Sequence, residues 1–97
     1  MLQKDQKQFL RGLAHHLKTI IWVGQKGTGA NVMQEINNAL DHHELIKIKI
    51  RVGDRDLRDQ TAAEICKATA AEAVQKTGNI LVLFRRNPEQ PKINLPE

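Results

Sequence analysis

The residues best suited to chemistry in this chain of 97 residues form a glycine turn, Gly24-Gln25-Lys26-Gly27, followed by Thr28. The turn joins the apolar run 20–23 to an amphipathic stretch that begins near Val32. Glycines lack the Cβ atoms that would hold a phosphodiester away, and the N–H groups and dipole at the start of a following helix favour an anion. We therefore expect the backbone N–H groups from Gly24 to Thr28 to contact phosphate oxygens, with Lys26 adding a charge-assisted contact.

Two other interpretations of the turn stay open. Glycine can serve only to allow a positive φ angle in a tight connection between a strand and a helix. The turn can also cradle the phosphate of a mononucleotide. Against the second interpretation, residues 24–29 match neither GxxxxGK[ST] nor GxGxxG in register, and no general base or metal pair accompanies them. We therefore expect no enzymatic activity, no cofactor and no small-molecule substrate.

Basic residues recur at regular spacing elsewhere in the chain. The net charge is +4 and the isoelectric point is near 9.5, as expected for a protein with a polyanionic partner. On a helical wheel, one sector of roughly a quarter turn holds only cations; it is compatible with an ordinary solvated helix face, but the absence of an acid within it favours RNA contact. Its members are Lys4, Lys7, Arg11, His15 and Lys18.

A second group of cations follows the strict alternation of residues 45–52. The apolar residues face one side, and Lys47, Lys49 and Arg51 face the other. These cations are equally compatible with RNA contact and with protection of an open sheet from aggregation.

The aromatic residues are few and lie in apolar runs. We expect Phe9, Trp22 and Phe84 to pack in the core, which leaves base stacking a minor role. The sequence therefore favours recognition of the RNA backbone and of RNA shape.

Several other classes of protein are disfavoured. No apolar run approaches the roughly 20 residues of a membrane-spanning helix, and the first residues lack the apolar core of a secretory signal. Cys66 is the only cysteine, so no disulfide can form within the chain, and we expect a cytoplasmic protein. Adjacent histidines in a helix diverge by about 100°, so we expect no metal site.

Seven elements must position these residues. Apolar spacing predicts helices over 4–17, over 30 to about 43 after an N-cap at Gly29, and over 55–69. Strands are predicted over 19–23, which we expect to be covered on both faces, and over 45–52, 73–75 and 80–84. The first helix should bury the stripe Phe9, Leu10, Leu13, Ala14 and Leu17.

This α-β-α-β-α-β-β order predicts a single α/β domain over residues 1–86, with three helices and a four-stranded mixed sheet. Residues 87–97 contain three prolines among polar residues, and we expect them to form a mobile tail.

Four segments in this order carry a resemblance to a known family. They are Ile21-Trp22-Val23-Gly24-Gln25-Lys26-Gly27, Asn31-Val32, His43-Glu44-Leu45-Ile46-Lys47-Ile48-Lys49, and Gly78-Asn79-Ile80-Leu81-Val82-Leu83-Phe84-Arg85. The chain resembles the YhbY family, the bacterial stand-alone form of the chloroplast RNA splicing and ribosome maturation (CRM) domain.

The resemblance implies an RNA-binding module similar in fold to the C-terminal domain of translation initiation factor three. It also implies a role with structured ribosomal RNA and precursors of the large ribosomal subunit. The family more often has a basic residue at the first variable position of the turn, where this chain has Gln25, so we expect Lys26 to carry the charge. A protein-interaction adaptor that uses the polar sheet face remains an alternative.

Overall fold

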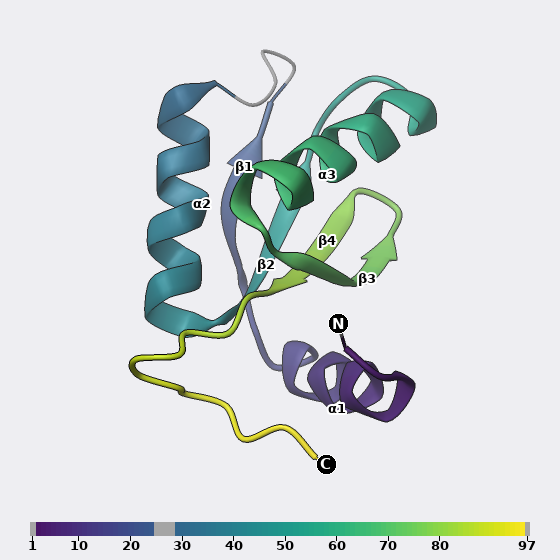
Figure 1. The fold of residues 1–97 in the computed structure, drawn as a ribbon. Coiled ribbons are helices and arrows are strands. Elements are labelled where there is room, and N and C mark those ends of the chain that lie inside the picture. Colours follow the sequence, from purple (N-terminus) through teal and green to yellow (C-terminus); the bar gives the residue numbers. More distant parts are fainter. Residues whose placement is uncertain (1, 25–28, 97) are drawn as a thin grey trace.

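The computed structural model describes residues 2–24 and 29–96 and contains the predicted elements in the predicted order (Figure 1). The four strands form one mixed sheet in the order β1-β2-β4-β3, in which β1 and β2 run parallel and the other neighbours run antiparallel. The α/β fold class is therefore confirmed. The elements are α1 (Lys4–Ala14), β1 (Thr19–Val23), α2 (Ala30–His43), β2 (Leu45–Ile50), α3 (Arg55–Thr69), β3 (Glu72–Thr77) and β4 (Ile80–Phe84).

Local signals explain where several elements begin and end. The Asp54 carboxylate accepts a hydrogen bond of 2.8 Å from the Leu57 N–H and caps α3. Gly78 has a φ of +59° in the hairpin between β3 and β4, a conformation that side chains disfavour. These boundaries follow from the chain's own turn chemistry.

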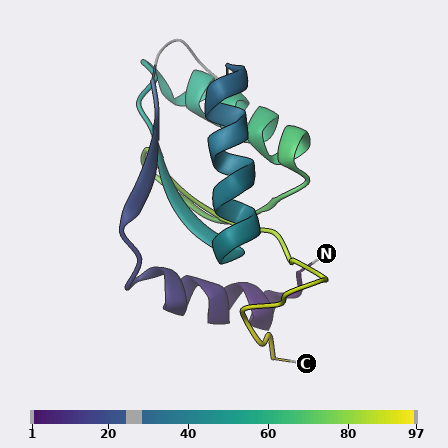
Figure 2. The same ribbon diagram turned by 90° about the vertical axis from the view of Figure 1, so that its left-hand side faces the viewer.

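One face of the sheet is covered by two helices. Figure 2 shows α2 and α3 on the same side of the sheet. Alternate strand residues point toward these helices and form the larger core with Ile36, Leu40, Ala62 and Ile65. The strand residues in this core include Ile21, Val23, Ile46, Ile48, Ile50, Leu81 and Leu83.

The other face is covered at one end only. Leu10 and Ala14 of α1 pack in a smaller core with Leu45, Val82 and Phe84, where β2 begins and β4 ends. The predicted helix is too long, because α1 ends at Ala14. The predicted buried stripe is also too wide: Phe9, Leu13 and Leu17 are 39%, 38% and 36% exposed. The neighbouring elements cover these three side chains only in part.

Strand β1 also differs from the prediction of a strand covered on both faces. Ile20 and Trp22 are 42% and 52% exposed, whereas Ile21 and Val23 are buried. The reason is that β1 lies at the edge of the sheet, while α1 packs mainly against β2 and β3. Only the α2 side of β1 is covered.

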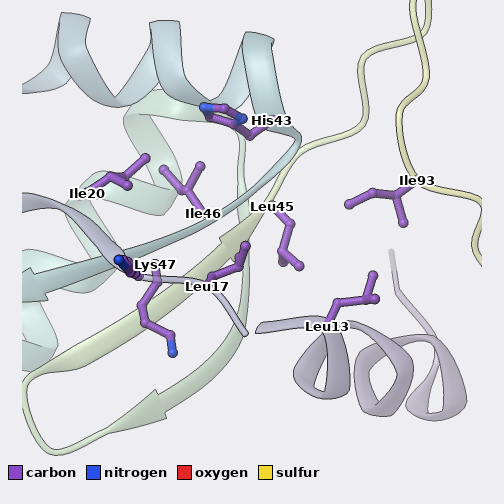
Figure 3. Close-up of a pocket in the computed structure, with 9 residues that line it drawn as sticks. Leu13, Leu17, Ile20, His43, Leu45, Ile46, Lys47 and Ile93 are labelled. Atoms are coloured by element: carbon purple, nitrogen blue, oxygen red, sulfur yellow. The ribbon is translucent and has the colours of Figure 1, made fainter. Parts of the chain in front are cut away.

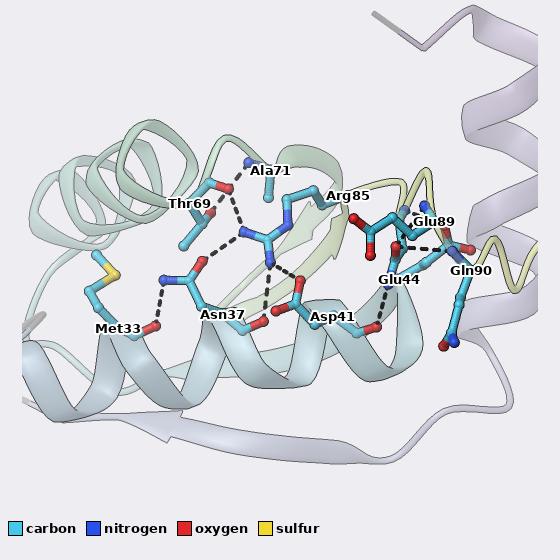
Figure 4. Close-up of polar contacts among 10 residues, drawn as sticks. Met33, Asn37, Asp41, Glu44, Thr69, Ala71, Arg85, Glu89 and Gln90 are labelled. Atoms are coloured by element: carbon cyan, nitrogen blue, oxygen red, sulfur yellow. Dashed lines mark hydrogen bonds and ion pairs between the residues drawn. The ribbon is translucent and has the colours of Figure 1, made fainter.

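A single arginine joins the ends of three elements. The Arg85 guanidinium, just after β4, donates to the Asn37 Oδ1 at 2.7 Å, the Thr69 carbonyl oxygen at 2.7 Å and the Asp41 carboxylate at 2.9 Å (Figure 4). These bonds tie β4 to α2 and to the C-terminal end of α3. Arg85 therefore has a structural role.

The segment after Arg86 contains no helix or strand within its described residues, and it binds a buried carboxylate. Glu44, between α2 and β2, is fully buried and accepts hydrogen bonds from the N–H groups of Asn87, Lys92 and Ile93 at 2.6, 2.7 and 2.9 Å. The side chains of Ile93 and Leu95 pack on the smaller core. The sequence pattern gives no sign of these contacts, and the mobility expected for residues 87–97 stays a prediction.

Burial raises the pKa of the Glu44 carboxyl, but the three N–H donors and the charge of Arg86 outweigh burial and hold the pKa below its ordinary 4.5. A lowered pKa in the folded state means that the ionised group stabilises the fold above about pH 4.5. This contribution is lost as the pH falls through the folded-state pKa.

We predict that Glu44→Gln lowers the free energy of unfolding at pH 7 by about 1 to 3 kcal/mol, because N–H donors lose a charged acceptor. Urea denaturation at pH 7 and at pH 3.5 measures this, and the difference from wild type should shrink at the lower pH. Glu35→Gln, at an exposed position of α2, is the control and should change stability by less than about 0.5 kcal/mol. Equal stability of wild type and Glu44→Gln at pH 7 would contradict the assignment.

Candidate nucleic-acid interface

Gly24 occupies a position where the fold itself does not require glycine. Its φ angle lies outside the left-handed region, and a Cβ atom placed there would meet no atom of the described residues within 4 Å. A positive φ angle therefore does not explain the glycine at position 24, whereas the same question for Gly27 lies outside the described residues. A glycine here leaves the surface open to close approach from outside the protein. The other predicted contacts of the turn, Gln25, Lys26, Gly27 and Thr28, lie outside the described residues.

The beginning of α2 is favourable for an anion. Gly29 is the N-cap, as predicted, with extended backbone (φ −64°, ψ 167°). Among the described residues no side chain caps this end, and the first turn of α2 contains no acidic residue. Neither a described capping side chain nor an acidic residue of its own first turn therefore neutralises the first N–H groups of α2 and the positive end of its dipole.

Arg51 lies beside the end of β1. Its backbone N–H donates a hydrogen bond of 2.7 Å to the carbonyl oxygen of Val23, the residue before Gly24. The side chain of Arg51 is exposed. A cation therefore stands next to the entry of the glycine turn.

Lys47 and Lys49 occupy the open face of β2, as the alternation predicted. The sheet register pairs Thr19 with Lys47 and Trp22 with Lys49, so these residues share a face. Both lysines are half-buried, and neither takes part in an ion pair with any residue that the structure describes. Their charges are available to an external anion.

The cations of α1 lie at the opposite end of the sheet from Gly24 (Figures 1 and 2). Lys4 and His15 are exposed and Arg11 is half-buried. The Nζ atom of Lys7 is 3.8 Å from the Glu72 carboxylate of β3, which reduces the positive charge there. A helical wheel cannot show this acid, because Glu72 is distant in the sequence.

Lys18 lies beyond the end of α1 and, with Lys47, lines a pocket of about 330 Å³ (Figure 3). Its other walls are mainly apolar, with Leu13, Leu17 and Ile20 among them. The predicted site residues therefore fall into two groups. One group, Lys49 and Arg51, lies near Gly24. The other group consists of the cations of α1, and Lys18 and Lys47 lie between the two groups.

Trp22 and Phe9 are the aromatic residues that the sequence interpretation misplaced. It is 52% exposed on the open face, and Phe9 is 39% exposed on α1, so neither is a core residue. Phe84 is buried, as predicted. Along β1, buried and exposed residues alternate, as is typical of an edge strand. The sequence did not predict this alternation, because the exposed positions are also occupied by β-branched and aromatic residues.

Other kinds of site are not supported by the described residues. Over 2–24 and 29–96, no cluster of three or more His, Cys, Asp or Glu side chains could hold a metal ion. Burial raises the pKa of the Cys66 thiol, which disfavours the reactive thiolate. In the same part of the chain, no helix has both the length and the apolar character needed to cross a membrane.

The fold and the arrangement of charge define a small α/β domain that presents cations along one side of a mixed sheet. Comparison with known families then identifies it. Residues 2–85 match the CRS1/YhbY (CRM) domain, and the chain belongs to this family, as the resemblance indicated.

Individual relatives agree with this family. An RNA-binding protein of Haemophilus influenzae is 47% identical over 95 residues, which cover 98% of this chain and 95% of that protein. The Bacillus subtilis protein YqeI, named a probable RNA-binding protein, is 36% identical and is covered over its whole length, with 99% of this chain. The solution structure of the Staphylococcus aureus protein SAV1595 superimposes with a TM-score of 0.84 at 34% identity, covering 99% of this chain and 100% of that one.

Proposed function

We propose that this protein binds structured ribosomal RNA through the glycine turn and the adjoining basic surface, and acts in assembly of the large ribosomal subunit. The relatives named as RNA-binding proteins support the class of ligand. Gly24 is the observation that carries the proposal, because neither a positive φ angle nor any described neighbour requires the lack of a side chain there. The proposal assigns the protein no catalytic step.

In this mechanism, a phosphate approaches Gly24 and the beginning of α2. Backbone N–H groups of residues 24–28 donate to the phosphate oxygens, and Lys26 and Arg51 supply the charge. These contacts carry little sequence information, because every nucleotide has the same phosphate. Lys47 and Lys49 extend the positive surface along β2.

The cations of α1 supply a second contact at the far end of the sheet. An RNA that touches both groups must reach across the open face of a protein whose longest dimension is 38 Å. A folded RNA holds distant phosphates in fixed positions, whereas a short flexible strand does not. The separation of the two groups therefore favours structured RNA.

We predict that Gly24→Ala folds as well as wild type and binds RNA at least about tenfold more weakly. The new methyl group meets none of the residues that the structure describes, but it stands where a phosphate must approach. Fluorescence anisotropy with a labelled fragment of large-subunit ribosomal RNA measures the affinity, and thermal melting checks the fold. Gly12→Ala, at an exposed position of α1 that is equally open, is the matched control and should keep full affinity. Unchanged binding by Gly24→Ala would remove the close approach from the mechanism.

Lys26→Ala should lower the slope of log affinity against log salt by about 0.7 to 0.9, the value for one phosphate contact. The loss of affinity should be similar for RNAs of different sequence, because the contact is to the backbone. Titrations over a salt series measure both effects. Lys67→Ala, on the exposed surface of α3, is the control. An unchanged slope would show that Lys26 does not contact phosphate.

The ribosomal part of the proposal predicts which RNA is bound in cells. Crosslinking followed by sequencing of the attached RNA should recover large-subunit ribosomal RNA, enriched in precursor particles over mature ribosomes. The Gly24→Ala protein should recover much less of it. Recovery of mainly messenger or transfer RNA would contradict the ribosomal assignment and leave RNA binding intact.

A further inference from the structure

The half of the sheet face that α1 leaves uncovered carries an unusual row of side chains. The register aligns Trp22 of β1 with Lys49 of β2, Lys49 with Ile80 of β4, and Ile80 with Thr77 of β3. Residues aligned in this way share a face of the sheet. Trp22 stands at the outer edge of the row and is 52% exposed.

The indole ring of Trp22 takes no part in the packing clusters of the described residues. The ring belongs to neither hydrophobic core, and the one contact between aromatic rings among the described residues joins His42 and His43. A large exposed aromatic side chain on a sheet indicates an interaction surface.

The charges around Trp22 define the chemistry of its ligand. Lys49 is the partner of Trp22 on the adjacent strand, and the two backbones are roughly 5 Å apart. Lys47 lies two residues before Lys49 on β2 and points to the same face of the sheet. No acidic residue belongs to the row of Trp22 or to the row of Lys47, which continues through Val82 and Gln75. The ligand must therefore present a flat apolar face together with negative charge. A nucleotide has both.

The position of Trp22 along β1 favours RNA over an acidic peptide. Trp22 precedes Gly24 by two residues, or about 7 Å of strand, and Arg51 lies beside the same end of β1. A polynucleotide whose phosphate rests at Gly24 can thus place an adjoining base over the indole without leaving the surface. The base must be unpaired, because both faces of a base inside a duplex are already stacked.

We propose that Trp22 is a stacking platform for an unpaired base of the bound RNA, with Lys49 and Lys47 contacting the phosphates next to that base. This inference rests on the proposed RNA binding and adds a class of ligand to it: a loop, bulge or single-stranded end of a structured RNA. It also reverses the expectation that base stacking is minor in this protein.

The chain offers a direct probe, because Trp22 is its only tryptophan and it has no tyrosine. Fluorescence excited at the tryptophan band therefore reports on this ring alone. We expect a single-stranded RNA of ten nucleotides to quench the emission as it binds, and the same strand in a blunt duplex to quench it far less. Anisotropy of an end-labelled RNA, measured in parallel, reports binding at any part of the surface.

Variants separate stacking from other contacts. Trp22→Leu should weaken binding of the single strand about tenfold, which corresponds to about 1.4 kcal/mol, and leave duplex binding within about twofold. Trp22→Phe keeps an aromatic face and should retain most of the affinity. Phe9→Leu, which removes the exposed ring on α1, is the matched control and should have no effect. Circular dichroism checks that each variant is folded.

The possible failures can be told apart. RNA binding without quenching, with full affinity in Trp22→Leu, would overturn the stacking platform and leave the proposed function standing; the exposed face would then be free for a protein partner. An equal loss of single-strand and duplex binding in Trp22→Leu would also overturn stacking. Absence of binding to any RNA, single-stranded, duplex or ribosomal, would overturn the proposed function and the platform together.

Discussion

The unequal covering of the two sheet faces is the constraint on which the rest of this structure depends. Two helices close one face over its length, whereas α1 closes only the end of the other face, through Leu10 and Ala14. Apolar strand residues are buried where a helix covers them and remain in contact with solvent where none does. The exposure of Ile20 and Trp22 on β1 results from this short helix and its position.

Among the described residues, the polar side-chain contacts that tie distant elements together gather at the C-terminal half of α2. Glu44 and Arg85 connect the C-terminal half of α2 to the chain that follows β4, and both use most of their hydrogen-bonding capacity within the protein. The beginning of α2 has no such partner among the described side chains. One end of the domain is thus held together by internal charge, while the other presents N–H groups and cations outward.

Cations that look equivalent in the sequence differ in whether an acidic side chain of this chain lies beside them. Arg85 and Lys7 face acidic side chains of this chain at 2.9 and 3.8 Å, and Lys76 pairs with Asp59 at 3.0 Å. Lys47, Lys49 and Arg51 have no ion pair with any described residue. Counting cations cannot make this distinction, because the acids that neutralise them come from other elements.

The order of the elements, the alternation of β2, the hairpin at Gly78 and the family could all be predicted from the sequence, because each depends on residues close together in the chain. The solvent exposure of Trp22, the acid beside Lys7 and the binding of residues 87–93 to Glu44 could not. Each of these depends on a contact, or on a missing contact, between elements far apart in sequence. The periodicity of apolar residues in the sequence indicates which face of an element is apolar, but only the packed structure decides whether another element covers that face.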